Sequence, residues 1–188
     1  MSKLEDPELT VPSDKTLVRA VLAGERKAYE ELYDLYAPLV RAICYDVTNN
    51  LADAQDLAQD VFMRAYERLG HLRKPDCFGK WVIGIARLRC REWQRATLRS
   101  RGKFIKLEHA ESVSVNPSSD RCIERLRKTI RALPEKERLA LHTFYLQSES
   151  AEDARRIVGL SRSGFYRVLE RARKRLERLL AEERDDIR

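Results

Sequence analysis

The apolar residues of this sequence recur at intervals of three and four positions in one segment after another, and this spacing limits the fold most. One stripe contains Tyr29, Leu32, Tyr36, Val40 and Ile43. Residues spaced in this way share one face of an α-helix. Glycine and proline are scarce, with 7 and 6 in 188 residues, which disfavours a turn-rich β architecture. The sequence therefore predicts an all-α protein.

Interruptions of the helical spacing divide the chain into parts. Pro38 is expected to kink its helix or restart it, because proline lacks the backbone N–H of a helix interior. Residues 99–119 lose the periodicity and become polar, as in a connection between domains. We therefore predict two helical domains, residues 1–98 and 120–188, joined by a flexible linker.

Charge is distributed unevenly along the chain, whose net charge is +7. Arg87 to Lys106 holds eight basic residues and one acid, and Arg155 to Arg178 holds nine basic residues and two acids. Asp53 to Glu67, by contrast, holds four acids and one arginine. Charge runs are often only solvated helix faces, but two basic stretches and a separate acidic one indicate a polyanion partner and a cationic partner.

The sequence offers little for catalysis, metal binding or a membrane. The four cysteines show no C-x-x-C pair and no histidine at zinc spacing, so we expect reduced structural thiols and neither a metal nor a cofactor. Gly159 to Ser163 only partly fits a nucleophile elbow, which argues against an enzyme. No apolar run approaches the roughly 20 residues of a membrane span, and the charged N-terminus lacks a signal peptide. These features favour a cytoplasmic protein without membrane insertion.

The C-terminal segment has the pattern of a helix-turn-helix. A short helix over 151–158 is followed by Gly159, which can adopt positive φ, and Ser161, which can cap a long basic helix over about 162–184. A helical hairpin with a basic face is the alternative interpretation. The residues expected to face DNA are Arg162, Ser163, Tyr166, Arg167, Glu170 and Arg171.

The order of these features resembles the extracytoplasmic-function sigma factors over nearly the whole chain. DAQDLAQDVFMRAY (Asp53–Tyr66) is similar to their polymerase-binding motif, and FGKWVIGIAR (Phe78–Arg87) is similar to their promoter-reading helix. LPEKERLALHTFYL (Leu133–Leu146) and the helix-turn-helix segment resemble the start and the DNA-reading part of region 4. The resemblance implies a protein that binds core RNA polymerase and directs transcription initiation at promoters.

The resemblance also implies roles for particular residues. Core polymerase, through its clamp helices and flap, would be one partner, promoter DNA another, and an anti-sigma factor a possible third. The clamp helices would meet the acidic face formed by Asp53, Gln55, Asp56, Gln59 and Asp60. The −10 element would be bound by His71, Arg73, Lys74, Phe78, Lys80, Trp81, Arg87 and Arg91. The −35 element would be read by the six exposed residues of the C-terminal helix named above.

The sequence departs from the family pattern in the polymerase-binding motif. Gln55 stands where an acid is usual and Ala58 is small, so we expect weakened core binding or help from a partner or modification. One alternative is a helix-turn-helix regulator that is not a polymerase subunit, and another is an adaptor that binds only protein. The regulator leaves the acidic helix and the tryptophan-containing basic helix unexplained. Trp81 itself has an alternative role in the core.

Overall fold

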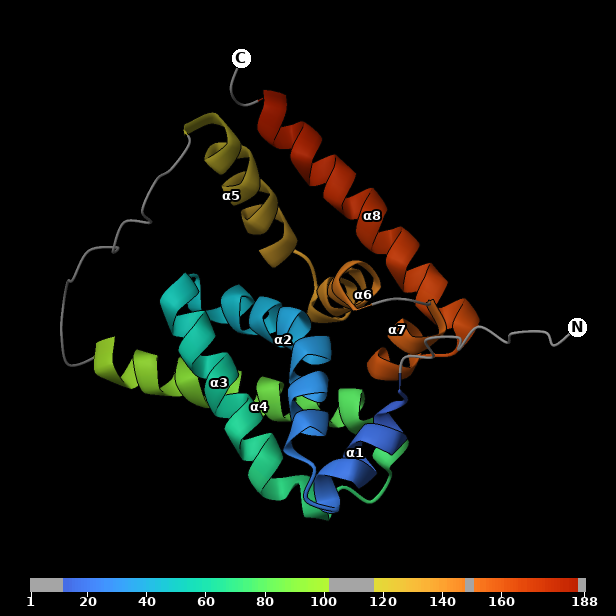
Figure 1. Ribbon diagram of the computed structural model, residues 1–188. Helices are drawn as coiled ribbons and strands as arrows, with labels where there is room; N and C mark the ends of the chain where they lie inside the picture. The colour runs from blue at the N-terminus through green and yellow to red at the C-terminus, as the bar shows by residue number, and fades with distance from the viewer. Residues whose placement is uncertain (1–11, 102–116, 148–150, 186–188) are drawn as a thin grey trace, which may run out of the picture.

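The computed structural model describes residues 12–101, 117–147 and 151–185, and every regular element in these ranges is helical. The N-terminal part contains α1 (Asp14–Leu22), α2 (Arg26–Thr48), α3 (Leu51–Arg68), two 3₁₀ turns (Leu69–His71 and Pro75–Cys77) and α4 (Phe78–Arg101). The C-terminal part contains α5 (Pro117–Arg131), α6 (Glu135–Leu146), α7 (Ala151–Val158) and α8 (Arg162–Asp185). Figure 1 shows the first group below and the second above. The all-α prediction is confirmed.

The first domain is a bundle in which α2, α3 and α4 pack on one another. The predicted stripe of α2 is buried, with Leu32 and Val40 fully inaccessible and Tyr36 nearly so. Val61 of α3 and Val82 of α4 complete this core. The helix α2 is continuous through Pro38 and changes direction along its length in Figure 1, which fits a kink and excludes a restart.

A half-buried carboxylate joins α1, α2 and α4. Asp14 accepts hydrogen bonds from Tyr36 Oη, at 2.8 Å, and from the backbone N–H of Gly79, at 3.3 Å. Burial raises the pKa of Asp14 above its ordinary value, and the two hydrogen bonds oppose that effect. The contact sets the position at which α4 begins, just after the loop predicted to bind DNA.

Alanine substitutions at two glycines of α4, Gly79 and Gly84, are expected to change the free energy of unfolding in opposite directions. A Cβ at Gly79 would lie 2.6 Å from the Tyr36 ring, so Gly79→Ala should lower the free energy of unfolding by about 1–3 kcal/mol. Gly84 has no such neighbour within 4 Å, and Gly84→Ala should raise that free energy by about 0.5–1 kcal/mol through its helix preference. Urea unfolding of both variants measures the difference. Equal effects would contradict the close packing at Gly79.

The second domain has its own core around α6, α7 and α8. Phe165 and Ala172 of α8 are fully buried against Ala140 of α6 and Ala154 of α7. Glu137 is buried on α6, and its Oε2 lies 3.4 Å from Arg175 Nη1 of α8. This pair links α8 to α6, and Figure 1 shows α8 running past α6.

The two domains pack against each other. Leu139 of α6 and Ile157 of α7 are buried in the core of the first domain, beside α2 and α4. The helices α4 and α5 extend to Arg101 and from Pro117, which shortens the predicted linker of 99–119 at both ends. The rest of that predicted linker lies outside the described residues.

Candidate functional site

The acidic face predicted on α3 is present and exposed. The side chains of Asp53, Gln55, Asp56 and Gln59 are exposed, while Leu57 and its neighbours along the apolar line are buried. The helix begins where Asn50 Oδ1 accepts a hydrogen bond from the backbone N–H of Asp53, at 3.1 Å. The carboxylates therefore lie near a helix N-terminus, on a surface open to a cationic partner.

Asp60 is part of this face but also binds cations of its own chain. Its carboxylate pairs with Arg64 Nε, at 3.4 Å, and with Arg89 of α4. Arg89 also pairs with Glu92, so the group fixes α4 against α3. Asp53 and Asp56 are consequently the carboxylates that the acidic face presents most openly.

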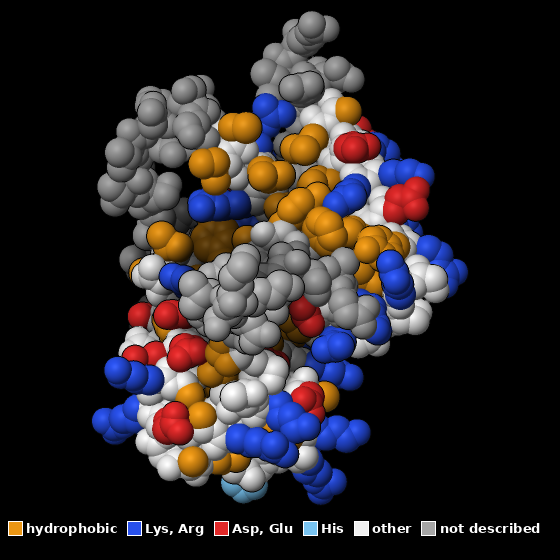
Figure 2. All heavy atoms as spheres, turned by 45° about the vertical axis from the view of Figure 1, so that its right-hand side comes forward, with side chains coloured by type: hydrophobic (Ala, Val, Ile, Leu, Met, Phe, Trp, Pro, Cys, Tyr) orange, Lys and Arg blue, Asp and Glu red, His pale blue; other side chains and the backbone are white. Residues whose placement is uncertain are grey.

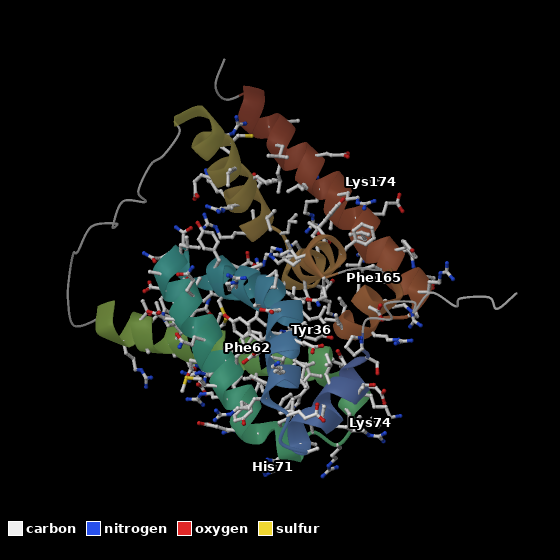
Figure 3. All side chains as sticks on the ribbon, in the orientation of Figure 1. Tyr36, Phe62, His71, Lys74, Phe165 and Lys174 are labelled. Carbon is white, nitrogen blue, oxygen red and sulfur yellow. The ribbon has the colours of Figure 1, made fainter. Side chains whose placement is uncertain are left out.

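The loop before α4 carries an exposed cationic set. His71, Arg73 and Lys74 are exposed, and the two 3₁₀ turns hold the loop at one end of the first domain. Figure 3 shows His71 and Lys74 at the lower end of the molecule, and Figure 2 shows Lys and Arg side chains around that end. The loop can therefore meet a polyanion without rearrangement of the core.

Two aromatic residues of α4 lie in the core rather than on the surface. Phe78 is fully buried, with its ring centroid 5.4 Å from that of Tyr36 and 6.0 Å from that of Trp81. The prediction that Phe78 contacts DNA is therefore corrected, because its ring cannot reach a base without leaving the core. Trp81 is half-buried and packs on the same core, which fits its alternative role and leaves part of the residue accessible.

The remaining predicted cations of α4 are exposed, but two of them lie against the second domain. Arg87 Nε is 2.6 Å from Glu135 Oε1 of α6. A Cβ placed on Gly159 would lie 3.2 Å from Lys80 Nζ, so this lysine abuts the turn of the helix-turn-helix. Arg91 is exposed on the same helix.

The helix-turn-helix has the local structure expected from the sequence. Gly159 has φ of 75°, and its N–H and that of Leu160 donate to the carbonyls of Arg156 and Arg155, each at 3.1 Å. Ser161 Oγ accepts from the N–H of Gly164 at 3.2 Å and so caps α8. These caps confirm the predicted turn between α7 and α8.

The outer face of α8 presents the predicted DNA-reading set to solvent. Arg162, Ser163, Tyr166, Arg167, Glu170 and Arg171 are all exposed. The ammonium of Lys174 lies 2.8 Å from the Glu170 carboxylate, and this hydrogen bond lowers the pKa of Glu170 below its ordinary value. An exposed basic helix of this length fits the DNA major groove and its flanking phosphates.

Apolar side chains also remain accessible where α5 and α8 approach each other. Ile123 and Leu126 of α5 are exposed, and Leu176 and Leu179 of α8 are half-buried. Figure 2 shows hydrophobic side chains gathered over this upper half of the molecule, around a hollow. A surface of this kind is typical of protein–protein contact.

The described helices were compared with the requirements of a metal-ion site and of a membrane span. Within residues 12–101, 117–147 and 151–185, no group of three or more His, Cys, Asp or Glu side chains could hold a metal ion. None of the helices in these same ranges is long and apolar enough to span a bilayer. The surfaces described above are all suited to macromolecular contact.

Comparison with known proteins shows that several of these surfaces fall within one family model. A family model described as Sigma-70 region 2 matches residues 32–100, which include the acidic face, the cationic loop and α4. The chain is 28% identical over 191 residues to the RNA polymerase sigma-H factor of Pseudomonas aeruginosa, covering 93% of this chain and 99% of that protein. It is also 28% identical over 174 residues to the ECF RNA polymerase sigma factor BldN of Streptomyces coelicolor, covering 89% of this chain and 66% of that protein.

Residues 32–100 match the Sigma-70 region 2 family model, and most of the chain is similar to sigma factors of the extracytoplasmic-function type. Another relative, the probable RNA polymerase sigma factor RfaY of Xanthomonas campestris, is 28% identical to this chain over 159 residues. That match covers 80% of this chain but only 40% of the relative, so the chain spans less than half of RfaY.

Two solved structures have the same fold as this chain. CnrH, in complex with the cytosolic domain of CnrY, matches with a TM-score of 0.64 and 20% identity, over 91% of this chain and 99% of CnrH. The sigma factor RpoE from Bartonella quintana, in complex with the anti-sigma factor NepR, matches with a TM-score of 0.55 and 25% identity, over 82% and 98% of the two chains. Both comparisons confirm an arrangement of two helical domains.

Sequence reasoning missed the residues that join the two domains of this protein. Asp46 of α2 binds Arg138 and His142 of α6 in the interior, at 2.6 and 3.0 Å. A cavity of about 250 Å³ lies beside them, with Arg87 and Glu135 also in its lining. Nothing in the spacing of these residues signals the contact, because the partners lie about a hundred positions apart.

Proposed function

We propose that this protein is a sigma factor of the extracytoplasmic-function type, which binds core RNA polymerase through the acidic face of α3 and directs it to promoters. The observation that carries the proposal is the separation of an exposed acidic helix from two exposed basic DNA-reading surfaces. Asp53 and Asp56 can meet cationic side chains of the polymerase clamp helices, while α4 and α8 remain outside that contact. Complementary charge of this kind raises association rates and fixes the orientation of docking.

At the −10 element, the loop before α4 and the exposed face of α4 would bind the opened DNA strand. His71, Arg73 and Lys74 supply exposed donors, and Arg91 with the accessible part of Trp81 extends the surface along α4. Unstacking a base costs a few kcal/mol, so captured bases and backbone contacts must supply that free energy. Phe78 would act indirectly in this process, by packing beneath α4.

At the −35 element, the outer face of α8 would enter the major groove. Tyr166 and Glu170 point to the bases because they lie one turn apart on the exposed face, while Arg167 and Arg171 flank them for phosphate contact. The apolar surface around Ile123 and Leu126 is where we place the polymerase flap. Two separate polymerase contacts would then hold both DNA-reading helices on one promoter.

The remaining expectations follow from this activity. The protein would work in the cytoplasm, beside polymerase and DNA, and would catalyse no reaction by itself. An anti-sigma factor is a candidate partner, as the complex of the Bartonella RpoE with NepR suggests. The alternative of a helix-turn-helix regulator that is not a polymerase subunit leaves the exposed acidic face of α3 without a role.

Binding to purified core RNA polymerase tests the proposal. Titration of the fluorescently labelled chain with core enzyme should give a saturable complex whose affinity falls with rising salt, because the α3 contact is ionic. If the chain binds duplex DNA by itself but does not bind core enzyme, the alternative of a helix-turn-helix regulator is favoured. A chain that binds neither would favour a protein-only adaptor.

The glutamine in the acidic face supports a specific prediction. Gln55 is exposed beside Asp56, so Gln55→Glu adds a carboxylate to the polymerase-facing surface. Exposed ion pairs contribute about 0.2–1 kcal/mol, so the affinity for core enzyme should rise by up to about fivefold. The same titration measures the change, with Gln94→Glu on α4 as a charge-matched control. Unchanged affinity of Gln55→Glu would show that Gln55 does not weaken core binding.

A further inference from the structure

Two cysteine side chains of the first domain lie together in its core. Cys44 of α2 is fully buried, Cys90 of α4 is 4% exposed, and both are free thiols. The Cys90 sulfur lies 3.9 Å from the carbonyl oxygen of Ile43, the residue before Cys44, and the two thiols are hydrogen-bonded to each other. We propose that Cys44 and Cys90 form a peroxide-reactive dithiol that closes to a disulfide between α2 and α4.

The two thiols are not equivalent, because one donates the hydrogen bond that the other accepts. Donation from the Cys44 thiol stabilises the Cys90 thiolate and lowers the pKa of Cys90 below the ordinary value of a cysteine. Burial, Asp46 and Glu135 oppose this effect, and the guanidinium of Arg89 adds to it. The same hydrogen bond, together with burial, raises the pKa of Cys44. Cys90 is therefore the attacking thiol, and Cys44 is the thiol that closes the disulfide.

A small oxidant has a place to bind beside Cys90. The side chain lines a cavity of about 250 Å³, whose lining also contains Ile43 and the cationic residues Arg87, Arg91 and Arg138. One water molecule in the liquid occupies about 30 Å³, so a cavity of this size accommodates hydrogen peroxide, which is little larger than water. The polar groups of the lining can hydrogen-bond the peroxide, which an apolar core could not do. The oxidant therefore meets Cys90 first.

Hydrogen peroxide supplies the oxidising equivalents in two steps. The Cys90 thiolate attacks one peroxide oxygen, so the S–O bond forms and the O–O bond breaks. The leaving hydroxide takes up the proton that Cys90 released, which gives a sulfenic acid and one water. The Cys44 sulfur then attacks the Cys90 sulfur, and the oxygen leaves with the Cys44 proton as a second water. Two thiols are thus oxidised to one disulfide while one peroxide is reduced to two waters.

The disulfide would enclose α3 and the loop before α4 in one covalent loop, because these elements lie between positions 44 and 90. A cross-link restricts the unfolded chain more than the folded one, so the oxidised protein should be the more stable form. Its midpoint of thermal unfolding should rise by at least about 5 °C and return to the reduced value after treatment with dithiothreitol. A lower midpoint in the oxidised form would overturn the fit of the disulfide between the two helices.

Oxidation of the full chain tests the proposal in the background Cys77→Ser with Cys122→Ser, which removes the two more accessible thiols. With one equivalent of hydrogen peroxide, the intact mass should show the loss of two hydrogen atoms. A non-reducing digest should then link the peptides that contain Cys44 and Cys90. The disulfide should form at least about fivefold faster in the folded chain than in the same chain unfolded in urea, because folding increases the thiolate fraction. A folded chain that stays reduced, or reacts no faster than the unfolded chain, would overturn the proposal.

Single substitutions in the same background test which thiol attacks. Cys44→Ser keeps a hydroxyl that can donate to Cys90, so peroxide should leave Cys90 as a sulfenic acid that dimedone labels. Cys90→Ser removes the attacking thiol, and Cys44 should stay unlabelled at the same dose. Any other pattern, in variants with the wild-type circular dichroism spectrum, would overturn the assignment of Cys90 as the nucleophile. This reactivity needs neither polymerase nor DNA, so a failure of core binding would refute the proposed function separately.

Discussion

The Asp56→Arg variant is expected to lose at least about tenfold in affinity for core RNA polymerase and to support no promoter-specific transcription. Asp56 is exposed on α3, and no internal ion pair of Asp56 is seen among the described residues. Reversal therefore replaces an attraction to the cationic clamp with a repulsion, and tenfold in affinity corresponds to about 1.4 kcal/mol. Titration with labelled core enzyme measures the loss.

A matched reversal separates this local effect from the change in net charge. Glu25 precedes α2, is exposed and makes no side-chain capping bond, so Glu25→Arg changes the net charge equally away from α3. Glu25→Arg should keep wild-type core affinity within about twofold, and both variants should unfold at the wild-type temperature. Equal loss in the two variants would show that α3 is not the docking surface.

The Phe165→Ala variant is expected to unfold the second domain. Phe165 is fully buried beneath α8, and removal of a buried phenylalanine side chain costs about 3–5 kcal/mol. A small domain has about 5–15 kcal/mol of stability in total, so a loss of this size removes a large share of it. Thermal unfolding followed by circular dichroism should show an earlier transition, and limited proteolysis should cut first in α7 and α8.

The adjacent residue provides the contrast. Tyr166 is 45% exposed, so Tyr166→Ala should change the free energy of unfolding by less than about 1 kcal/mol. That variant should remain folded, bind core polymerase normally and lose discrimination at the −35 element. If Tyr166→Ala unfolds the domain while Phe165→Ala does not, the assignment of the inner and outer faces of α8 is wrong.

Local features of the chain were predictable because their causes are local. The spacing of apolar residues predicted the helices, and the sequence from Ala151 to Ser161 predicted the short helix, the positive φ of Gly159 and the serine cap. Helical periodicity and capping depend on neighbours within four positions. The acidic face of α3 and the basic face of α8 were predicted for the same reason.

Features that depend on tertiary packing were missed. Phe78 lies on a helix whose sequence resembles a DNA-reading motif, but its place at the start of α4 turns it toward Tyr36 and the core. Asp14 of α1 accepts a hydrogen bond from the backbone N–H of Gly79, 65 positions away. The packing of the second domain on the first depends on Asp46 and α6 in the same way. Such pairs follow no periodicity, so a single sequence contains no signal for them.

Transcription in vitro from a genomic DNA library, with and without the chain, tests the central claim most directly. The account predicts transcripts that start at defined sites only when core RNA polymerase and the chain are both present, preceded by two common sequence elements. The result that would contradict it is core polymerase that neither binds the chain nor starts transcription with it, while the isolated chain binds duplex DNA with a salt slope of about −0.9 per phosphate.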